Sequence, residues 1–378
     1  MELKEYRFDE VTINFDKKRV PLSGAQREKR QGKYRYYGAQ GVIDHIDDFI
    51  FDGTYLLIAE DGENLKSKKQ NIAQVVEGQF WVNNHAHIVQ GNELCDTRYL
   101  SYLLNGIDLS GYVTGSAQPK LSQANLNAVT LFLPPIFIQK KIVDYLYLFD
   151  KKIAVNQQIN DNLQLQVATI FHQWFVANPE SEKWPLVTLD SLTSLVSRGI
   201  APKYTDDSVQ IVLNQKCIRD HYIDISLARR HNPKVINEKW LQYGDLLINS
   251  TGEGTLGRAA QVWFVPDNMT VDSHVTIVRP KGQHLLFYIG LWGISHEREI
   301  EALHTGSTGQ TELPRERVKA MKLRLPDNDT LARFNAVIAP IVSLIITNQQ
   351  ENVRLASVRD SLLPKLMSGE IDVSDIQL

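Results

Sequence analysis

Basic and aromatic residues are mixed near the start of the chain in a way that suits contact with nucleic acid. Residues 17–35 contain eight lysines and arginines against a single acidic residue, Glu28, and three tyrosines interleave with or adjoin them: Tyr34, Tyr36 and Tyr37. Positive side chains attract phosphate and aromatic rings contact bases, so this composition is what DNA binding would use. A solvated basic loop is the alternative explanation, and the cluster taken alone favours it.

One pattern resembles a cofactor motif but lacks the element that the chemistry needs. Gly252, Gly254 and Gly257 form a GxGxxG loop, yet residues 259–265 after it have the composition of a strand. A dinucleotide loop must open a helix, because the helix N-terminus faces the pyrophosphate. We therefore predict a β-turn that could approach the DNA backbone, and no cofactor in this chain.

The motifs of enzymes that act on DNA are missing from the sequence. The double proline, Pro134-Pro135, stands between Leu133 and Ile136 and not in the Asn-Pro-Pro-Tyr type of motif with which an adenine methyltransferase holds a flipped base. The sequence has no P-loop with Gly-Lys-Ser or Gly-Lys-Thr, and no carboxylate pair recurs at a spacing that suggests a nuclease. We predict that no residue of this chain is catalytic.

Potential metal ligands are sparse. His85 and His87 would lie on one face of a strand and could together bind a metal. The matching stretch of the second half keeps only His274 and has Thr276 in place of His87, so we favour hydrogen-bonded structural histidines. The two cysteines are too few and too isolated for a disulfide framework or a zinc site. We predict no metal site.

The composition is that of an ordinary soluble protein with more than one domain. Of 378 residues, 43% are hydrophobic and 22% charged, and the net charge of -3 gives no global argument for nucleic acid. The longest apolar run, residues 337–346, is interrupted by Pro340 and Ser343 and is shorter than the roughly 20 residues of a membrane span. The polar start of the chain has no signal-peptide pattern. We expect a cytoplasmic protein with no membrane contact.

Two halves of the sequence correspond segment by segment. Residues 55–58 (YLLI) match 245–248 (DLLI), and residues 83–89 match 272–278. The TGS segments, residues 114–121 and 305–313, each lead into a strand-like run that ends in Leu-Pro. The unbroken order indicates a duplication. Short β-branched and aromatic runs between Gly, Asn and Asp turns predict mostly β or mixed segments with one or two small helices.

Each half ends in a long helical pattern whose apolar residues recur at alternating steps of three and four. Each pattern carries two asparagines in its seam, where buried asparagines usually fix the register of paired helices. An antiparallel pairing would place Asn156 near Asn352 and Asn160 near Asn348. A parallel pairing also matches asparagine to asparagine, but a whole globular segment connects the two helices and favours the antiparallel arrangement.

Two prolines bear on the length of the second helix. Pro340 and Pro364 are predicted to limit its regular part to about residues 341–363, with a bend or loop at either end. At about 1.5 Å per residue, helices of roughly 23 to 33 residues span roughly 35 to 50 Å. One turn of B-DNA measures roughly 34 to 36 Å, so such a rod could hold two DNA-reading modules over half-sites separated by an unread spacer.

Several segments resemble those of specificity subunits of type I restriction-modification systems. The resemblance lies in residues 358–371 (VRDSLLPKLMSGEI), in residues 142–175 of the first long helix, in the two TGS segments and in residues 184–189 (WPLVTL). It covers essentially the whole chain. It implies two target recognition domains, each reading half of an asymmetric bipartite site in double-stranded DNA, joined by a spacer of two antiparallel helices.

The resemblance also implies partners. Two modification subunits would dock on the chain, bring S-adenosylmethionine and methylate adenine at N6, while restriction subunits would translocate and cleave DNA with ATP and Mg²⁺. The chain itself would catalyse nothing. The first half departs from the family pattern because residues 6–11 lack a Trp-Pro start, so this domain either starts atypically or is completed by the tail at residues 369–376.

We therefore predict an α+β fold with pseudo-twofold symmetry. Residues 1–137 would form the first target recognition domain and residues 138–178 the central spacer helix. Residues 179–328 would form the second recognition domain, and residues 329–378 the distal spacer helix and tail. A protein-interaction scaffold with duplicated β-rich modules is the alternative, and a stand-alone methyltransferase or nuclease comes third.

The candidate DNA-binding residues are polar side chains in the expected loops of both halves. Arginine and lysine can grip phosphate or guanine, and asparagine and glutamine can pair with adenine edges. In the first half the candidates are Arg27, Arg30, Lys33, Arg35, Tyr37, Asn64, Lys66, Lys68, Lys69, Gln118 and Lys120. In the second half they are Arg198, Lys203, Tyr204, Asn214, Lys216, Arg219, Arg229, Arg230, Arg258, Ser307 and Gln310. An ordinary exposed side chain is the competing interpretation at each position.

Overall fold

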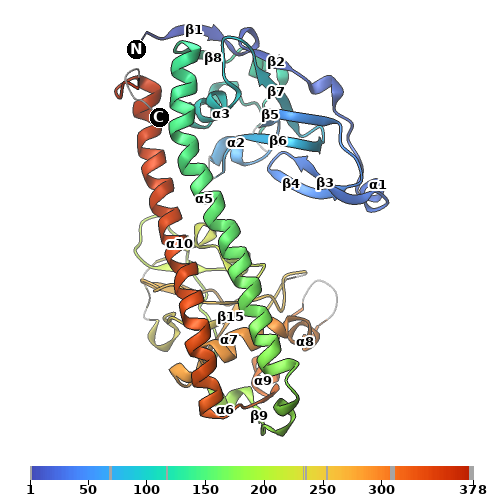
Figure 1. The fold of residues 1–378 in the computed structure, drawn as a ribbon, viewed down its shortest axis with the longest axis vertical. Coiled ribbons are helices and arrows are strands. Elements are labelled where there is room, and N and C mark those ends of the chain that lie inside the picture. The colour runs from blue at the N-terminus through green and yellow to red at the C-terminus, as the bar shows by residue number, and fades with distance from the viewer. Residues whose placement is uncertain are drawn as a thin grey trace. The chain divides into compact units, whose positions relative to one another are not determined.

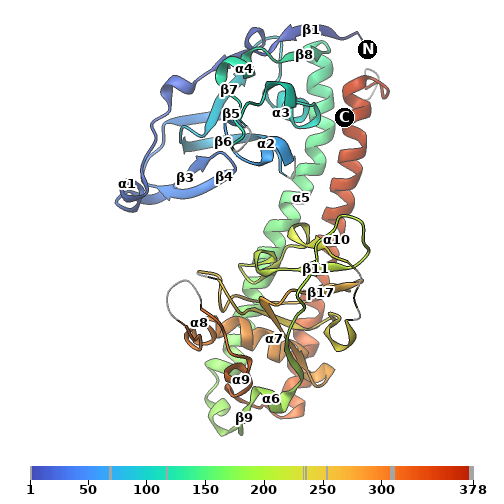
Figure 2. The same cartoon turned by 180° about the vertical axis from the view of Figure 1, so that it is seen from behind.

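The chain forms two compact units. The computed structural model describes residues 2–67, 70–115, 118–232, 234, 236–252, 254–306 and 311–373. The first unit comprises Met1–Ala154 and Asn352–Leu378, and the second comprises Val155–Glu351. Two long helices contribute to both units, so each unit contains a lobe of strands and short helices together with part of the helix pair (Figures 1 and 2).

The lobe of the first unit is built on a six-stranded sheet in the order β2-β7-β5-β6-β3-β4. Neighbouring strands are antiparallel except β3 and β6, which are parallel. Helix α3 packs on this sheet through buried Tyr99, Leu100 and Leu104, and the Asp96 carboxylate caps its N-terminus. A separate ribbon joins β1 to β8. The elements are β1 Lys4–Arg7, β2 Thr12–Asn14, α1 Gly24–Glu28, β3 Gln31–Gly38, β4 Gly41–Ile46, β5 Phe51–Ala59, α2 Asn64–Ser67, β6 Ala73–Val82, β7 Ala86–Gly91, α3 Thr97–Gly106, α4 Gln123–Asn127 and β8 Thr130–Leu133.

The lobe of the second unit divides its strands between two larger sheets. Four strands follow the order β10-β18-β15-β16, and three follow the order β14-β11-β17. Two small ribbons pair β12 with β13 and β9 with β19. The elements are β9 Leu186–Thr188, α6 Leu189–Leu192, β10 Thr193–Arg198, β11 Ile211–Leu213, β12 Ile218–Arg219, β13 Tyr222–Ile223, β14 Arg229–Arg230, β15 Leu246–Asn249, β16 Ala259–Gln261, β17 Met269–Val271, β18 Val275–Pro280, α7 Leu286–Ser295, α8 Glu297–Ala302, α9 Arg315–Lys319 and β19 Lys322–Arg324.

Strand pairing confirms the predicted duplication. In the first unit β3 pairs in parallel with the end of β6, with Tyr36 opposite Trp81, and β4 covers the edge of β3. In the second unit β11 pairs in parallel with β17, with Val212 opposite Thr270, and β14 covers the edge of β11. The long strand β6 thus corresponds to two shorter strands, β16 and β17. The ribbon β1–β8 likewise corresponds to β9–β19, although the first half lacks the Trp-Pro start.

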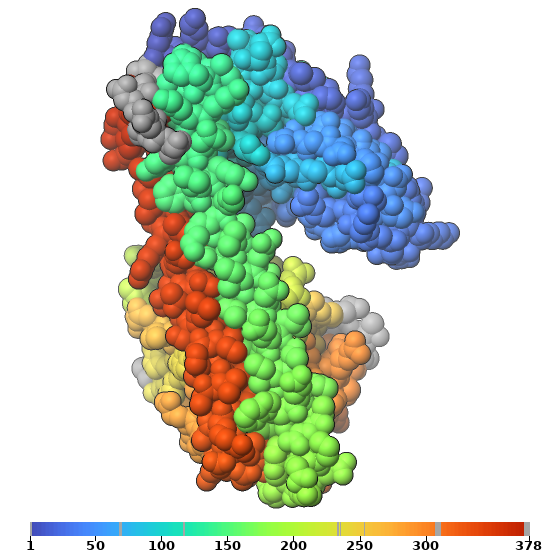
Figure 3. Space-filling view, in the orientation of Figure 1, coloured from blue at the N-terminus to red at the C-terminus, as the bar shows by residue number. Residues whose placement is uncertain are grey.

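The two long helices pair antiparallel within each unit, as predicted. They are α5, Ile136–Phe171, which continues into a π-helical turn at His172–Val176, and α10, Asn328–Ser368. In the second unit Asn348 donates to Asn160 at 2.8 Å, and Asn156 donates to Glu351 at 2.7 Å. In the first unit Asn352 lies 3.5 Å from the carbonyl oxygen of Ile153, and Arg359 pairs with Asp150 at 2.5 Å. Residue numbers rise along one helix as they fall along the other. Figure 3 shows the side chains of α5 and α10 in contact with each other.

The predicted restriction of the second helix to residues 341–363 is wrong, because α10 continues through both prolines. A proline ring removes one backbone N–H and leaves the carbonyl four residues earlier without its helical donor. Pro340 and Pro364 are both exposed, so these carbonyls lie where water can hydrate them. Ile338 and Val342 beside Pro340, and Leu366 beside Pro364, are almost completely buried and hold the helix against its unit.

The apolar stretch of α10 belongs to a protein core. By length and composition α10 is the one helix among the described residues that could cross a membrane. Its apolar side chains Phe334, Ile338, Val342 and Ile345 are fully buried, and they pack with α5 and α7 in the second unit. Burial inside the unit accounts for these four apolar side chains.

The tail of the chain packs into the first unit. Val373 is 2% exposed and belongs to the same hydrophobic core as Phe8, Tyr99 and Ile142. Of the two explanations for the unusual start of the first half, the structure therefore supports completion by the tail. Each unit uses a segment that follows the end of a long helix to close its core.

Candidate nucleic-acid interface

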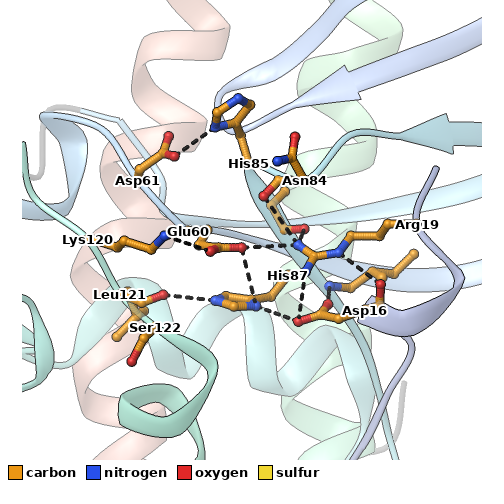
Figure 4. Close-up of polar contacts among 12 residues, drawn as sticks. Asp16, Arg19, Glu60, Asp61, Asn84, His85, His87, Lys120, Leu121 and Ser122 are labelled. Atoms are coloured by element: carbon orange, nitrogen blue, oxygen red, sulfur yellow. Dashed lines mark hydrogen bonds and ion pairs between the residues drawn. The ribbon is translucent and has the colours of Figure 1, made fainter. Parts of the chain in front are cut away.

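Three loops meet at one end of the sheet in the first unit, which we call the loop end. They are the segment after β5, the segment before β7 and the TGS segment around Lys120 (Figure 4). Backbone bonds join them, since Glu60 N–H donates to the His85 carbonyl at 2.9 Å and Gly62 N–H donates to the Pro119 carbonyl at 3.2 Å. The His85 ring lies 2.7 Å from the Asp61 carboxylate. The loop end therefore presents backbone and polar side chains from three separate parts of the sequence.

A buried ionic network fastens this end to the sheet. His87 lies on β7 and is 1% exposed, with Nδ1 2.6 Å from Asp16 and Nε2 2.8 Å from the carbonyl oxygen of Leu121. The Asp16 carboxylate and the Leu121 carbonyl are both acceptors, so the imidazolium form, which donates from both ring nitrogens, suits this site. Arg19 joins Asp16 to Glu60, and Glu60 also pairs with Lys120 at 3.2 Å (Figure 4).

The pKa values of the buried pair reflect this network. Burial acts against the charge on His87, but the hydrogen bonds to Asp16 and Leu121 and the negative charges of Asp16 and Glu60 raise its pKa. Burial also acts to raise the pKa of Asp16, but its hydrogen bonds to His87 and to the Ile88 N–H lower it below the ordinary value. His87 is the hydrogen-bonded structural histidine that was predicted. His85 precedes the strand, and its side chain is about half exposed.

The second unit builds the same loop end from different side chains. Ser250 N–H donates to the His274 carbonyl at 2.8 Å, and the Thr251 hydroxyl lies 2.8 Å from the His274 ring. A neutral pair, Ser250 and Thr276 at 2.6 Å, occupies the place of Glu60 and His87. The backbone bonds between the loops are therefore retained, while a neutral pair replaces the charged residues at these two positions.

One equivalent position at the loop end carries side chains of opposite charge in the two units. In the first unit the TGS segment carries Lys120, whose position corresponds to Glu312 in the second. Glu312 pairs at 2.7 Å with Arg198, which also donates to the Leu313 carbonyl at 3.2 Å. Arg198 stands on β10 opposite Thr276, which is the position of Asp16 relative to His87. These contacts hold the Arg198 side chain within the loop end.

Part of the basic cluster of the first unit is neutralised by ion pairs, which the sequence interpretation did not anticipate. Arg27 pairs with Asp44 at 2.8 Å, and Arg30 pairs with Asp47 at 2.9 Å. These carboxylates lie on or after β4, and strand pairing brings them against the arginines. Both guanidinium groups also stack on rings of the lobe, over Tyr36 and Trp81 respectively. Lys33 and Arg35 remain exposed on β3, with Arg35 bonded to the Glu77 carbonyl at 2.8 Å.

Two candidates of the first unit lie in its interior and are withdrawn as DNA contacts. Tyr37 is 4% exposed and packs edge-on against Phe80, and burial raises its pKa. Asn64 is also 4% exposed and accepts from Gln40 at 3.4 Å. Lys66 lies at the loop end and donates to the Gly115 carbonyl at 2.9 Å, near exposed Gln118. Lys68 and Lys69 lie outside the described residues.

The second unit presents an exposed platform of aromatic and basic residues. The Arg229 guanidinium lies 3.5 Å from the centre of the Tyr204 ring. Arg229 and Arg230 form β14, the edge strand of the three-stranded sheet, and both are exposed, as is Lys203. Arg230 is anchored by a bond to the Ser208 carbonyl. Burial raises the pKa of the Tyr204 hydroxyl, so this ring is a neutral surface for stacking.

The remaining candidates of the second unit cluster near its loop end. Asn214 begins the segment after β11, where its side chain accepts from the Lys216 N–H at 2.9 Å and donates to Leu227. Lys216 and Arg219 are exposed, and Arg258 is half-buried beside the glycine loop. Ser307 and Gln310 lie outside the described residues. The glycine loop is a turn that leads into β16 and not into a helix, as predicted.

Comparison with known proteins agrees with this organisation. The family model described as Type I restriction modification DNA specificity domain matches residues 2–165. Over these residues the chain is similar to type I restriction-modification specificity subunits. A putative specificity subunit from Haemophilus influenzae is 25% identical over 81% of each chain. The MjaIX specificity subunit from Methanocaldococcus jannaschii is 25% identical over 74% of this chain and 70% of its own.

A solved specificity subunit shares the fold. The crystal structure of the type I restriction-modification S subunit from M. genitalium covers 97% of this chain and 96% of its own, with a TM-score of 0.58 at 12% identity. Identity this low supports the α+β arrangement and no individual contact. No group of three or more His, Cys, Asp and Glu side chains able to hold a metal gathers among the described residues.

Proposed function

We propose that this chain is the DNA-recognition subunit of a type I restriction-modification complex. Each unit would read one half of an asymmetric bipartite site, and the helices α5 and α10 would set the spacing between the halves. The observation that carries this proposal is the loop end, a three-loop frame present once in each unit with different side chains. A repeated frame with divergent side chains suits two readers of different sequences.

The exposed side chains have the chemistry that DNA reading requires. In the second unit the stacked Tyr204 and Arg229 offer a flat ring and a forked donor, which suit a base or a phosphate. In the first unit Lys33 and Arg35 are exposed on β3, and Gln118 is exposed at the loop end. Phosphate contacts would position the duplex, and the loops would select its sequence.

We further propose that two modification subunits dock on the helix pair and that restriction subunits join the assembly. Members of this family recognise DNA, and catalysis would lie in these partners: methylation of adenine N6 with S-adenosylmethionine, and ATP- and Mg²⁺-dependent cleavage. Leu148, Leu165 and Val353 on the long helices are more than half exposed, which gives apolar surface for such docking. The complex would act in the cytoplasm.

Binding to duplex DNA at several salt concentrations tests the recognition role. The logarithm of the binding constant should fall linearly with the logarithm of salt concentration. Arg229→Ala with Arg230→Ala should weaken binding and reduce the salt slope by about one for each phosphate that the two arginines neutralise. Lys322→Ala is the matched control, because this exposed lysine lies on the β9–β19 ribbon and should leave the slope unchanged. Absence of salt-dependent binding would favour the protein-interaction scaffold.

Two further measurements test the division of labour. Purified chain incubated with labelled S-adenosylmethionine and DNA should transfer no methyl group, and transfer would overturn the assignment of catalysis to partners. Methylation mapping of the source genome should reveal one bipartite adenine-methylated motif that disappears when this chain is deleted. Persistence of every motif after deletion would contradict a role in target choice.

A further inference from the structure

The second unit carries a segment that has no counterpart in the first. In the first unit β3 and β4 are joined by a tight turn at residues 39–40. The corresponding strands of the second unit, β11 and β14, are joined by residues 214–228, which include the ribbon β12–β13. An insertion at an equivalent point is where two duplicated lobes can acquire different binding properties.

The ribbon has a buried face and an exposed face. Ile218 pairs with Ile223 across it, and both are buried against Leu247, Ala260 and Val262 of the lobe. Side chains alternate along a strand, so the second cross-strand pair points the other way. That pair is Arg219 opposite Tyr222, and both side chains are exposed.

The tip of the ribbon is held in a strained conformation. Asp220 and His221 both have positive φ, 51° and 62°, a region that glycine and asparagine occupy at lower cost. Strained backbone of this kind persists where the surroundings fix it and is concentrated at functional sites. Here the His221 ring lies 3.3 Å from the Glu297 carboxylate of α8, and Glu297 also accepts from the Ala259 N–H at 2.5 Å.

The base of the insertion is anchored as well. Asn249 donates to the Gln215 carbonyl at 3.1 Å, and the Thr251 hydroxyl donates to the Gln215 side chain at 3.3 Å. Thr251 belongs to the loop end, and Ala259 begins the strand that leaves it. The ribbon is therefore fixed at tip and base to the loop end, with its outer face free of the lobe.

We propose that Arg219 and Tyr222 read bases in the half-site of the second unit, with Arg219 recognising a guanine from the major groove. This inference rests on the proposed function and adds the residues that determine one half of the target. The major groove accepts a two-stranded β-ribbon, and the arginine fork matches O6 and N7 of guanine. The neighbouring Tyr222 ring supplies apolar contact for an adjacent base. The first unit, with only a two-residue turn here, reads its half-site without such an element.

Selection from a pool of random duplexes tests the inference. The full chain is used to enrich bound DNA, and sequencing gives the preferred motif. Arg219→Ala and Tyr222→Ala should each relax preference in one half of the motif and leave the other half unchanged. Arg219→Lys keeps the charge but removes the fork, so it should retain overall salt dependence while preference for guanine at one position falls about fivefold to a hundredfold. Lys322→Ala serves as the control and should reproduce the original motif.

The outcomes separate this inference from the proposed function. Both substituted side chains are exposed, so the circular dichroism spectra should match that of the unmodified chain. If the unmodified chain enriches a bipartite motif that the ribbon variants reproduce unchanged, or if both halves relax together, Arg219 and Tyr222 do not read the half-site. If the unmodified chain enriches no motif at all, the recognition role fails, and the inference fails with it.

Discussion

The asparagine pair between the long helices of the second unit predicts strongly non-additive substitutions. Asn348 donates to Asn160 at 2.8 Å, and Asn160 donates to the Ile345 carbonyl at 3.3 Å. The two side chains are 8% and 7% exposed. Replacing either asparagine by leucine leaves the other amide buried without this partner, whereas replacing both removes the two polar groups together.

The magnitude follows from the cost of an unsatisfied buried polar group, which is about 1–3 kcal/mol. Each single variant, Asn160→Leu or Asn348→Leu, leaves one buried amide unsatisfied and is destabilised by this amount. The double variant has no asparagine at either position, so this cost is absent. Packing effects of each leucine occur in single and double variants and cancel in the comparison. We expect the double variant to be more stable than the sum of the single effects predicts, by about 2 kcal/mol or more.

Urea unfolding followed by tryptophan fluorescence measures this coupling. Every tryptophan of the chain except Trp81 lies in the second unit, so the signal reports mainly on the unit that contains the pair. A control cycle with Gln166→Leu and Gln350→Leu, both exposed on the same helices, should be additive. Additivity of the asparagine variants within about 0.5 kcal/mol would refute the claim that this pair is a coupled, buried contact.

Three further predictions concern the fold of the two units. The raised pKa of His87 gives the folded state stability that is complete below about pH 6.5 and is lost as pH rises through the higher folded-state pKa. Hydrogen-exchange protection of the Ile88 amide, which donates to Asp16, should therefore fall over that pH range in the native chain and not in His87→Gln. Pro340→Ala restores a helical N–H and should stabilise the second unit by about 1–3 kcal/mol in urea unfolding, and no gain would mean that the helix already compensates. Val373→Asp should place a charge in the first core and increase proteolysis of the first unit alone, and unchanged proteolysis would contradict a structural tail.

The fold was predictable from sequence because it depends on the order of corresponding segments and on the period of apolar residues along the helices. Segment correspondence predicted the duplication, and the seam asparagines together with chain topology predicted antiparallel helices. The predicted boundary of the second helix was wrong because it was based on the low helix propensity of proline. The burial of the neighbouring residues outweighs that propensity. Ile338 and Val342 are fully buried on either side of Pro340. Tertiary packing outweighs a local hydrogen bond that water can replace.

The candidate site was less predictable because strand pairing determines which charges are compensated. Glu28 is the one acidic residue within residues 17–35, yet β4 brings Asp44 and the following turn brings Asp47 against Arg27 and Arg30. Asp16 and Glu60 were missed for the same reason, since nothing local connects them to His87. Repetition was the useful signal: His87 and Thr276 occupy equivalent places, which indicated a structural role before the partners were known.

The contrast between the two loop ends bears on how an asymmetric site can be read by a duplicated chain. The frame depends on backbone bonds such as Glu60 N–H to the His85 carbonyl and Ser250 N–H to the His274 carbonyl, which do not depend on side-chain identity. Side chains at equivalent places can therefore diverge while the frame is kept, and Lys120 in one unit corresponds to Glu312 in the other. Each of these side chains is held in an ion pair, Lys120 with Glu60 and Glu312 with Arg198, so a duplex would meet a different pair of charged groups at the same position of each unit. Two similar frames with different side chains should thus prefer different half-sites even before the additional ribbon of the second unit is considered.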